Sequence, residues 1–468
     1  MGIDFDNIAG KAPGRVAVIG AAKSGVAAAQ YFRARGSAVF ISDTCSRERL
    51  DGILRGSGLD VDGVESESDR HSDKVLSCEL IILSPGVRSD LDVLVRASAK
   101  GIPVWSEMEL GFRVSKAPFL AVTGSSGKST TVSLLASAMT GAGFETALVG
   151  NIGTPVIGVT PNLSGNAVVV AEVSSFQLET IDRFKPKVAS VINLMKNHLD
   201  RYSCEEEYYN AKLRIADNLT RSEYLVLNSD DVRLSSWAKE LSKRTNIIMF
   251  GTQCSNNKDC VFLSGNSIHY QFNGSCGEIL DDVMRMKISG RHNHINACAA
   301  AAIALAGGAM SERIARGLCN FAGLPHRLEY VTEINGIKFY NDSKSTTAES
   351  IECAVNAFGS KSVQLIAGGK DKGCDFSVIG NSLRSTVKNI VLLGEAKDRM
   401  SSQWEGIAPI HKTVTLEDAV STAFNLAAAG DRVVFSPGCS SFDMFKNFEH
   451  RGEMFRETVN ELASRKAC

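Results

Sequence analysis

The segment TGSSGKST at residues 123–130 has the residue types that bind a phosphate chain. Such binding needs backbone N–H groups in a glycine turn, a helix N-terminus, a lysine for the β and γ oxygens and a hydroxyl for Mg²⁺. An apolar run at 119–122 precedes the segment and a helical pattern follows it, which predicts a nucleotide site. Val122 stands where the strict pattern has glycine, so the loop is a shortened variant. Its residues are Gly124, Ser125, Ser126, Gly127, Lys128, Ser129 and Thr130.

Three ionisable residues further along the chain could complete this site. Glu172 lies at the end of an apolar run at 167–173, and His198 follows another at 188–194. The carboxyl ends of parallel strands meet at one edge of a sheet, so we expect both side chains beside the loop, where a carboxylate could hold a metal ion. Taken singly, Glu172 could face water and His198 could be structural. Lys212 lies in a helical segment, where a lysine is ordinarily solvated.

The last third of the chain has four polar loops beside apolar runs. They read PHRLE at 325–329, NDSKSTT at 341–347, GGKDKG at 368–373 and SPGCSSF at 436–442. Lysine and arginine in such loops suit carboxylate or phosphate groups, and arginine favours bidentate pairing. Any one of the four could also be an ordinary loop.

Alternating strand and helix patterns must position these residues. In a first block, apolar runs at 16–19 and 38–42 flank the turn GAAKSG at 20–25, a βαβ unit of the dinucleotide-binding type with Ala22 in place of its middle glycine. A second block begins near Trp105. Its stretch 229–287 is polar and is expected to be irregular, with a hairpin near 268–272. The third block, from about Leu324, has strand patterns at 363–367, 390–393 and 433–435 and a helix from Thr415 to Gly430. Such alternation predicts mostly parallel sheets with ligands at the strand ends.

Composition sets outer limits on the function. The 468 residues suffice for about three domains. Lys plus Arg number 51 against 52 for Asp plus Glu, which argues against a nucleic-acid-binding surface. The twelve cysteines include no C-x-x-C pair, so we expect reduced thiols and no cysteine zinc site. No run approaches roughly 18 apolar residues and no signal-peptide core is present, so we expect no membrane association and a cytoplasmic location.

Taken in order, these segments resemble the Mur ligases, the ATP-dependent amide-forming family that builds the peptidoglycan stem peptide. The resemblance covers nearly the whole chain and rests on TGSSGKST, EVSSFQLE at 172–179, NLMKNHLDRY at 193–202, AKLRI at 211–215, GRHNHIN at 290–296 and PHRLE. It implies an α/β fold of three domains. These are an N-terminal Rossmann-like domain at 1–106 that binds the UDP-substrate, a central P-loop ATPase-type domain with a parallel or mixed sheet at 107–322, and a C-terminal Rossmann-like domain at 323–468 that binds the amino acid.

Within the family, three segments resemble the branch that adds D-glutamate to UDP-N-acetylmuramoyl-L-alanine. They are DSKST at 342–346, GGKDKGCDF at 368–376 and SPGCSSFDMFKNFEHRG at 436–452. The resemblance implies these two substrates, an acyl-phosphate intermediate, ATP and Mg²⁺, with two metal ions, and a monomer as the working form.

The resemblance also implies roles for single residues. Catalysis is implied for Lys128, Glu172, His198 and Lys212, and metal binding for Ser129, Glu172, His198 and Lys212, the last as a carbamate formed with CO₂. ATP binding is implied for residues 124–130 and for Asn293, Asn296, Arg327 and Asp342. The UDP-substrate would contact Ala22, Lys23, Ser24, Asp43, Thr44, Ser84, Gly86 and Asn151. D-glutamate would contact Lys344, Thr346, Lys372, Ser441 and Phe448.

The chain departs from the family pattern at two positions. Asn197 stands where the family usually has Asp, which removes a negative charge near the metals, and Ser126 stands where the loop often has Asn. Neither change removes a metal ligand or the phosphate lysine, so we expect activity with altered metal affinity.

Other functions stay open from the sequence. A sibling ligase or a folylpolyglutamate synthetase-like enzyme would share the ATP chemistry and differ in the amino-acid pocket, although the D-N-P-R-type motif expected of a meso-diaminopimelate ligase is absent. From a different class, the first block could be a redox NAD domain with Asp43 on the ribose, against which Ala22 and the separate ATP loop count. A non-catalytic nucleotide switch is the third alternative, against which the metal and amino-acid pocket residues count.

Overall fold

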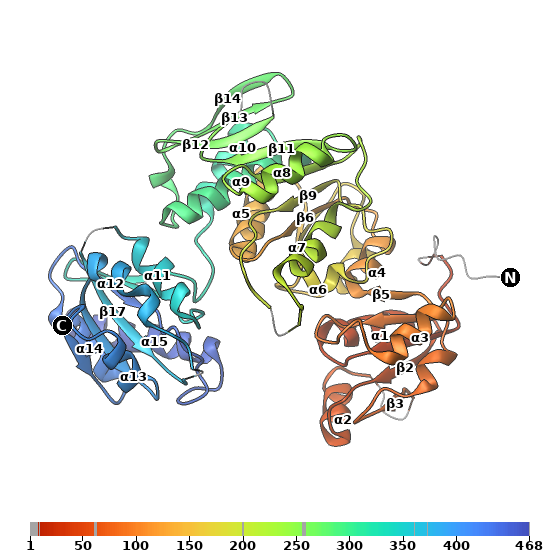
Figure 1. Cartoon of the computed structure of the whole chain (residues 1–468), viewed down its shortest axis with the longest axis horizontal. Coiled ribbons are helices and arrows are strands. Elements are labelled where there is room, and N and C mark those ends of the chain that lie inside the picture. The colour runs from red at the N-terminus through yellow and green to blue at the C-terminus, as the bar shows by residue number, and fades with distance from the viewer. Residues whose placement is uncertain are drawn as a thin grey trace. The chain divides into compact units, whose positions relative to one another are not determined.

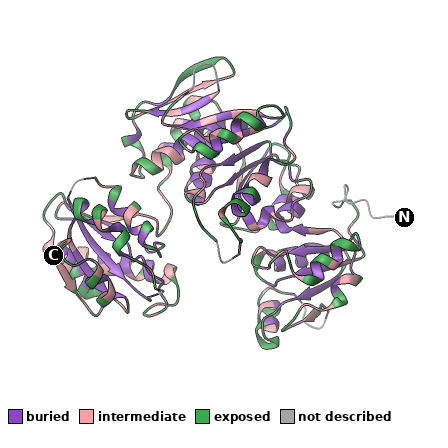
Figure 2. Ribbon diagram, viewed as in Figure 1, coloured by how far each residue is buried: buried purple, intermediate pink, exposed green. Residues whose placement is uncertain are grey.

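The computed structural model describes residues 8, 10–59, 63–198, 201–254, 259–359, 361–371 and 373–467. The chain divides into two compact units, Met1–Arg285 with Ile295–Asn320, and Met286–His294 with Phe321–Cys468. The first unit carries the β1–β5 and β6–β14 sheets, and the second carries the β15–β20 sheet (Figure 1). Figure 2 shows the central strands of each sheet as buried and many helix surfaces as exposed.

The N-terminal sheet is parallel, in the order β3-β2-β1-β4-β5. Its strands are near-continuous apolar runs because both faces are covered. Val16 and Val18 face helices α1 and α2, while Ala17 and Ile19 face helix α3. The elements are β1 (Arg15–Ile19), α1 (Lys23–Arg33), β2 (Ala38–Ser42), α2 (Arg47–Gly56), β3 (Glu65–Glu67), β4 (Leu80–Leu83), α3 (Asp92–Ala99), β5 (Val104–Ser106) and α4 (Glu107–Val114).

The turn after β1 explains why alanine is tolerated in the glycine pattern. A Cβ on Gly25 would lie 1.9 Å from the carbonyl oxygen of Gly20, so only glycine fits there. Ala22 has an extended backbone, φ −72° and ψ 178°, which any residue adopts. The predicted strands and the helix are therefore confirmed without the middle glycine.

The central sheet has the order β14-β13-β12-β11-β10-β9-β6-β8-β7. It is parallel from β7 to β12 and antiparallel from β12 to β14. The expectation that 229–287 is irregular is wrong, because this stretch forms helix α8 and four of the sheet's described strands, including the predicted hairpin strand at 267–272. The strands are β6 (Phe119–Thr123), β7 (Thr146–Gly150), β8 (Val168–Glu172), β9 (Val188–Val191), β10 (Tyr224–Asn228), β11 (Asn246–Gly251), β12 (Cys260–Ser264), β13 (Ser267–Phe272) and β14 (Ser275–Leu280).

Helices cover this sheet and begin where its loops end. Residues 297–307 of α9 are buried, and α10 approaches α5 so closely that Ser137 donates to the carbonyl of Gly317 at 2.7 Å. The helices are α5 (Lys128–Gly141), α6 (Ser175–Leu178), α7 (Glu205–Leu213), α8 (Val232–Leu241), α9 (Arg291–Gly307) and α10 (Ser311–Asn320).

The C-terminal sheet has the order β15-β16-β20-β17-β18-β19, with only the β15–β16 pair antiparallel among its described strands. Helices α11 to α13 pack on one face and α14 and α15 on the other. Helix α14 ends at Leu426, before the predicted Gly430. The elements are β15 (Glu329–Ile334), β16 (Ile337–Asn341), α11 (Ala348–Asn356), β17 (Val363–Gly368), α12 (Gly380–Thr386), β18 (Val387–Leu393), α13 (Lys397–Gln403), β19 (Ile410–Lys412), α14 (Leu416–Leu426), β20 (Arg432–Phe435) and α15 (Phe448–Ala467).

One expectation about the cysteines is corrected. The structure pairs Cys254 with Cys260 in a disulfide beside the start of β12, whereas the sequence predicted reduced thiols throughout. The other described cysteines are free thiols. Within the described ranges, every helix is too short or too polar to span a membrane.

Candidate functional site

The predicted phosphate loop connects β6 to α5 and is shaped by a segment that lies far away in the sequence. Asn193, just after β9, accepts from the backbone N–H groups of Ser125 (3.0 Å) and Ser126 (2.9 Å) through its side-chain oxygen. Gly127 has φ 77°, and a Cβ there would lie 2.8 Å from the side-chain oxygen of Asn296. Asn296 therefore lies against the loop, as its predicted ATP role requires. The role of Asn193 was missed, although it opens a motif that the sequence displays.

Two lysines converge on one carbonyl oxygen of this loop. Lys128 Nζ donates to the carbonyl of Gly124 at 2.9 Å and to that of Ser125 at 3.3 Å. Lys212 Nζ, from α7, donates to the same Gly124 oxygen at 2.8 Å. Ser129 is buried at the start of α5, beside these groups in the chain. The structure thus brings together the two predicted lysines, which are 84 residues apart (212 − 128).

Lys212 is not the solvated lysine that its helix position would ordinarily indicate. Its side chain is 1% exposed, and its Nζ lies 4.4 Å from the ring centre of Tyr208. Burial, together with the positive charge of Lys128, lowers the pKa of Lys212 to about 6, while Glu172 acts in the opposite direction. Its amine is therefore largely neutral at pH 7.

Glu172 lies at the end of β8, next to β6, with 2% of its surface exposed. Its Oε1 accepts from the side-chain amide of Asn151 at 2.8 Å, whereas Oε2 is buried and has no hydrogen-bond partner among the described residues. The hydroxyl of Ser190, in the same row of the sheet on β9, is in the same situation. Buried polar groups are nearly always paired, so these oxygens mark a place for a ligand. Ser190 was missed because it lies within an apolar run that predicts only a strand.

His198 forms part of the wall beside α6 and α7. Its ring centre lies 5.0 Å from that of Phe176 and 5.7 Å from that of Tyr208. The side chain is exposed, and φ is 55°, a left-handed conformation that residues other than glycine rarely adopt. Asn197 accepts from the backbone N–H of His198 at 2.9 Å.

The donor groups of this site fit a divalent cation. A buried carboxylate oxygen without a partner, the Ser129 hydroxyl and the exposed His198 ring supply oxygen and nitrogen ligands of the kind that Mg²⁺ and related ions take. Within the described part of the chain, no group of three or more His, Cys, Asp or Glu side chains could hold a metal by itself. A complete ligand set therefore needs a hydroxyl, a modified lysine, water or substrate oxygens.

The predicted uridine residues lie at the carboxyl edge of the N-terminal sheet. Asp43 accepts from the backbone N–H groups of Ala21 (2.6 Å) and Cys45 (2.8 Å). Burial alone would raise the pKa of the Asp43 carboxyl, but these hydrogen bonds outweigh it and lower the pKa. Ser84 donates to the carbonyl of Gly20 at 2.7 Å, which joins the loops after β1 and β4. Helix α1 begins with Lys23 and Ser24, and the loops after β2 and β4 contain Thr44 and Gly86. Asn151 lies apart from them in the central domain, where its side-chain amide donates to Glu172.

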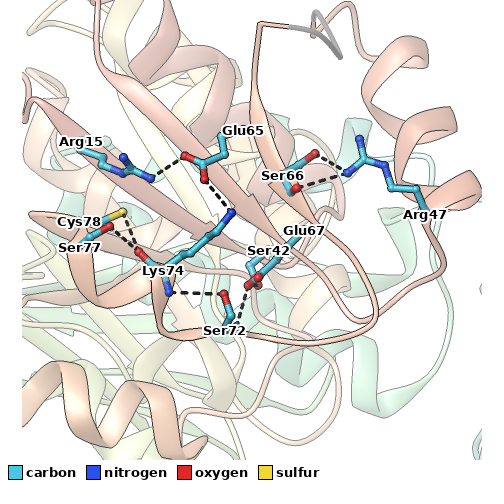
Figure 3. Close-up of polar contacts among 10 residues, drawn as sticks. All are labelled: Arg15, Ser42, Arg47, Glu65, Ser66, Glu67, Ser72, Lys74, Ser77 and Cys78. Carbon is cyan, nitrogen blue, oxygen red and sulfur yellow. Dashed lines mark hydrogen bonds and ion pairs between the residues drawn. The ribbon is translucent and has the colours of Figure 1, made fainter.

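Hydrogen bonds and ion pairs from strand β3 stabilise this edge of the sheet (Figure 3). Glu67 accepts from the hydroxyl of Ser42, the residue before Asp43, at 2.8 Å and from the backbone N–H of Ser72 at 2.7 Å. At the other end of the strand, Glu65 pairs with Arg15 at 2.6 Å and with Lys74 at 3.2 Å.

In the second unit, Asp342 follows β16 and is half-buried beside two loops. It accepts from the backbone N–H of Leu328 at 3.0 Å and from the hydroxyl of Ser436 at 2.8 Å. Burial raises the pKa of Asp342 to about 7, while these hydrogen bonds and the charge of Arg327 oppose the rise. Asn293 belongs to this unit, and its side chain donates to the carbonyl of Ser289 at 2.7 Å.

The predicted amino-acid pocket lies in the same unit. Lys344 Nζ is 4.9 Å from the ring centre of Phe448, which brings these two together. Thr346 is exposed and Ser441 is buried. Lys372 lies outside the described residues.

Arg451 lies within the segment SPGCSSFDMFKNFEHRG, and its role was missed from the sequence. Its buried guanidinium donates to the carbonyl of Cys439 at 3.0 Å and to the carbonyl and hydroxyl of Ser343 at 2.7 and 3.0 Å. It thereby joins the loops after β16 and β20, which carry Lys344 and Ser441. Burial lowers the pKa of Arg451 to about 10.

The sequence matches known domain families along most of its length. Residues 14–106 match the Mur ligase MurD-like N-terminal domain, 122–304 the Mur ligase middle domain, and 326–439 the Mur ligase glutamate ligase domain. The chain is 40% identical over 450 residues to the UDP-N-acetylmuramoylalanine–D-glutamate ligase of Geotalea daltonii, covering 96% of this chain and 98% of that one. It is 38% identical over 454 residues to the enzyme of that name from Caldicellulosiruptor bescii, covering 96% and 97%.

Solved structures share the fold. The UDP-N-acetylmuramate-alanine ligase of Thermotoga maritima superimposes with a TM-score of 0.58 at 17% identity, covering 96% of this chain and 99% of that one. The MurF ligase of Thermotoga maritima in complex with ADP gives 0.59 at 16%, covering 91% and 96%. With three family domains matched in order and relatives of this identity over almost the full length, the chain belongs to the Mur ligase family.

Proposed function

We propose that this Mur ligase joins D-glutamate to UDP-N-acetylmuramoyl-L-alanine at the expense of ATP. The observation that carries the proposal is the site at the ends of β6, β8 and β9. There a phosphate loop, a buried carboxylate oxygen without a partner among the described residues and a neutral lysine meet. The names of the relatives support the choice of substrates.

The chain's own groups act on the two reacting centres. Lys128 and the N-terminus of α5 hold the β and γ phosphates of ATP, so that charge spread over the transferring phosphoryl group is neutralised. The substrate carboxylate attacks the γ phosphorus, ADP leaves, and an acyl phosphate forms. The amine of D-glutamate then attacks the acyl carbon, the tetrahedral intermediate loses phosphate, and an amide remains. Positioning supplies most of the rate, because little covalent chemistry is required of the protein.

Mg²⁺ would be held by Ser129, Glu172, His198 and Lys212, with two ions proposed. When bound, it would offset the negative charge of the phosphate oxygens. The fit of Glu172 rests on its free oxygen, and that of Lys212 on conversion to a carbamate. A neutral amine can attack CO₂ and lose a proton to leave an anionic ligand, and burial supplies that neutral amine here.

The second unit would bind the amino acid. Lys344 beside Phe448, with Thr346, Lys372 and Ser441, suits the two carboxylates of D-glutamate. Asp342, Arg327, Asn293 and Asn296 would complete ATP binding. The loops after β1, β2 and β4, with Asn151, would hold the UDP part. This division corresponds to domains at 1–106, 107–322 and 323–468 in a cytoplasmic monomer, all of which stay predictions.

A panel assay of ADP release tests the proposal. The protein is given ATP, Mg²⁺, one UDP-muramoyl substrate with zero, one or two residues in its peptide, and one amino acid from D-glutamate, L-alanine, L-lysine and meso-diaminopimelate. Release that requires UDP-N-acetylmuramoyl-L-alanine together with D-glutamate supports the proposal. Release with another pair would identify a sibling ligase, and release with a folate and L-glutamate would identify a folylpolyglutamate synthetase-like enzyme.

A further inference from the structure

Arg201 has no part in the reaction described above, yet its side chain joins the two sheets of the first unit. It donates to the carbonyl oxygens of Pro85 at 3.3 Å and Val87 at 3.2 Å, in the loop after β4. It also donates to Oε2 of Glu179, just after α6 of the central domain, at 2.6 Å. The Arg201 side chain is 12% exposed and that of Glu179 14%, so these contacts are largely shielded from water.

Glu179 accepts hydrogen bonds from both the N-terminal and the central domain. Its Oε2 also accepts from the hydroxyl of Ser89, in the N-terminal loop, at 2.7 Å. Its Oε1 accepts from the hydroxyl of Tyr202 at 2.6 Å. Hydrogen bonds to a charged acceptor are stronger than those between neutral groups. We call Arg201, Glu179, Ser89 and Tyr202 the clasp.

The clasp also contacts the wall of the phosphate pocket. The Arg201 guanidinium lies 4.1 Å from the ring centre of Phe176, the ring that packs against His198. The carbonyl oxygen of His198 accepts from the backbone N–H groups of Arg201 (3.0 Å) and Tyr202 (3.1 Å). These contacts hold His198 in its left-handed conformation, which would be costly without such support.

We propose that Arg201 is a positioning residue that fixes the loop after β4 relative to the His198 wall. The proposal rests on the function proposed above, because that loop would hold the UDP-substrate and the wall borders the phosphate loop. A displacement of about 1 Å between reacting groups can lower a rate by about 100-fold. Lysine could not replace this arginine, since a single ammonium cannot reach two carbonyls and a carboxylate while stacking on a ring.

The competing explanation is that Arg201 forms an ion pair that serves only stability. Measuring the rate of acyl-phosphate formation and the Kd of the UDP-substrate separately distinguishes this explanation from a positioning role. Arg201→Lys is compared with Arg96→Lys, a matched control on α3 whose guanidinium pairs with Asp73 at 2.7 Å and with Asp92 at 2.8 Å. Single-turnover acyl-phosphate formation is followed by ADP release from ATP and UDP-N-acetylmuramoyl-L-alanine without D-glutamate. The Kd of that substrate is measured by calorimetry.

Arg201→Lys should form ADP about 30- to 100-fold more slowly, while the Kd of the UDP-substrate and the KM for ATP stay within about threefold of wild type. Arg96→Lys should match wild type. Tyr202→Phe, which removes one hydroxyl from the clasp and is a mild change for folding, should slow the same step by about 3- to 10-fold. Adding Ser89→Ala to Arg201→Lys should slow the step less than the product of the two single effects, because both act through Glu179.

Two outcomes would overturn the inference. One is a wild-type rate per folded molecule in Arg201→Lys and Tyr202→Phe, with only the Tm lowered, which would make the clasp structural. The other is a weakened Kd at an unchanged rate, which would make Arg201 a binding residue. If wild-type protein itself releases no ADP with this substrate but does so with another, the proposed function fails and the inference falls with it.

Discussion

The glycine loops after β1 and after β6 each join a parallel strand to a helix, and they differ in how their polar groups are satisfied. In the loops after β1 and β2, both oxygens of Asp43 accept backbone N–H groups, and Ser84 donates to Gly20. In the loop after β6, two lysines donate to one carbonyl and Glu172 keeps an oxygen without a partner among the described residues.

The same local architecture therefore serves two purposes. The N-terminal loops are internally satisfied, which suits recognition by a preformed surface. The central loop brings two lysines together, one of them largely neutral, and leaves buried polar atoms without partners among the described residues, as active sites do when a ligand completes them. We expect substitutions in the first region to change affinity and substitutions in the second to change the rate.

The largest contrast is expected between two lysines that open equivalent helices, Lys128 of α5 and Lys23 of α1. Lys128→Ala should lower ATP turnover by about 1,000-fold or more, because it removes the positive charge that neutralises the oxygens of the transferring phosphoryl group. Lys23→Ala should mainly raise the KM for the UDP-substrate. Steady-state kinetics with circular dichroism as a folding check decide the comparison. Near-normal turnover by folded Lys128→Ala would remove the nucleotide assignment.

Lys212 should respond to CO₂, unlike any group in the N-terminal region. Its pKa of about 6 lies below the usual value of about 10.4, so the amine is protonated below pH 6 and neutral above it. Carbamate formation needs the neutral amine, so activity should fall as the pH drops below about 6 and when CO₂ is removed. Lys212→Ala should be nearly inactive and partly rescued by short carboxylic acids. Full activity of Lys212→Ala in CO₂-depleted and bicarbonate-supplemented buffer alike would contradict the carbamate.

The amino-acid pocket should show an intermediate effect confined to one substrate. Ser441→Ala and Lys372→Ala each remove a hydrogen bond to a carboxylate, at a cost of about 1.5–3 kcal/mol, so the KM for D-glutamate should rise about 10- to 150-fold. The KM for ATP should not change. If ATP affinity falls and dependence on D-glutamate is unchanged, these residues belong to the nucleotide site.

Asp43→Asn should have a smaller effect on the recognition region. The substitution keeps one oxygen acceptor but removes the negative charge, which strengthens the hydrogen bonds from the backbone N–H groups of Ala21 and Cys45. Losing about 1–2 kcal/mol of loop order should raise the KM for the UDP-substrate about 5- to 30-fold and leave kcat unchanged. A fall in kcat with an unchanged KM would show that the two regions do not differ as described.

The smallest effect concerns stability where α4 meets the central domain. Burial raises the pKa of Glu107 to about 7, against the hydrogen bonds from Ile157 and Val156. This value lies above that of the unfolded chain, so the stabilisation is complete below about pH 4.5 and is lost as the pH rises through 7. The glutamine of Glu107→Gln does not titrate. The free energy of unfolding of this variant, relative to that of wild type, should therefore rise by up to about 3 kcal/mol between pH 5 and pH 8. Denaturant unfolding at both pH values measures the difference, and an equal difference at both would contradict the buried neutral acid.

Much of the fold followed from the sequence because buried parallel strands are continuous apolar runs between glycine turns. The strands that end before Asp43 and at Glu172 were predicted in this way. Strand β16, which ends before Asp342, was not predicted, because polar residues interrupt its apolar run, IKFYN. The stretch 229–287 was misjudged because β13 and β14 lie toward the edge of the sheet and contain few apolar residues. Strand β13 is largely half-buried, and the first part of β14 is exposed.

The site was predicted less completely, because several of its features depend on contacts between distant segments. Local pattern could not reveal that α7 buries Lys212 or that Asn193 shapes the phosphate loop. Arg201 and Arg451 donate to backbone carbonyl oxygens, which any residue type can supply, so no sequence pattern marks their partners.

Isotope transfer tests the central claim, that the pocket after β6 activates the carboxylate of the UDP-substrate by phosphorylation. The substrate is prepared with ¹⁸O in both carboxylate oxygens and turned over with ATP and D-glutamate, and the phosphate released is analysed by mass spectrometry. Attack of the carboxylate on the γ phosphorus predicts one ¹⁸O atom in each phosphate formed. Phosphate without ¹⁸O, at a normal rate of amide formation, would contradict the account.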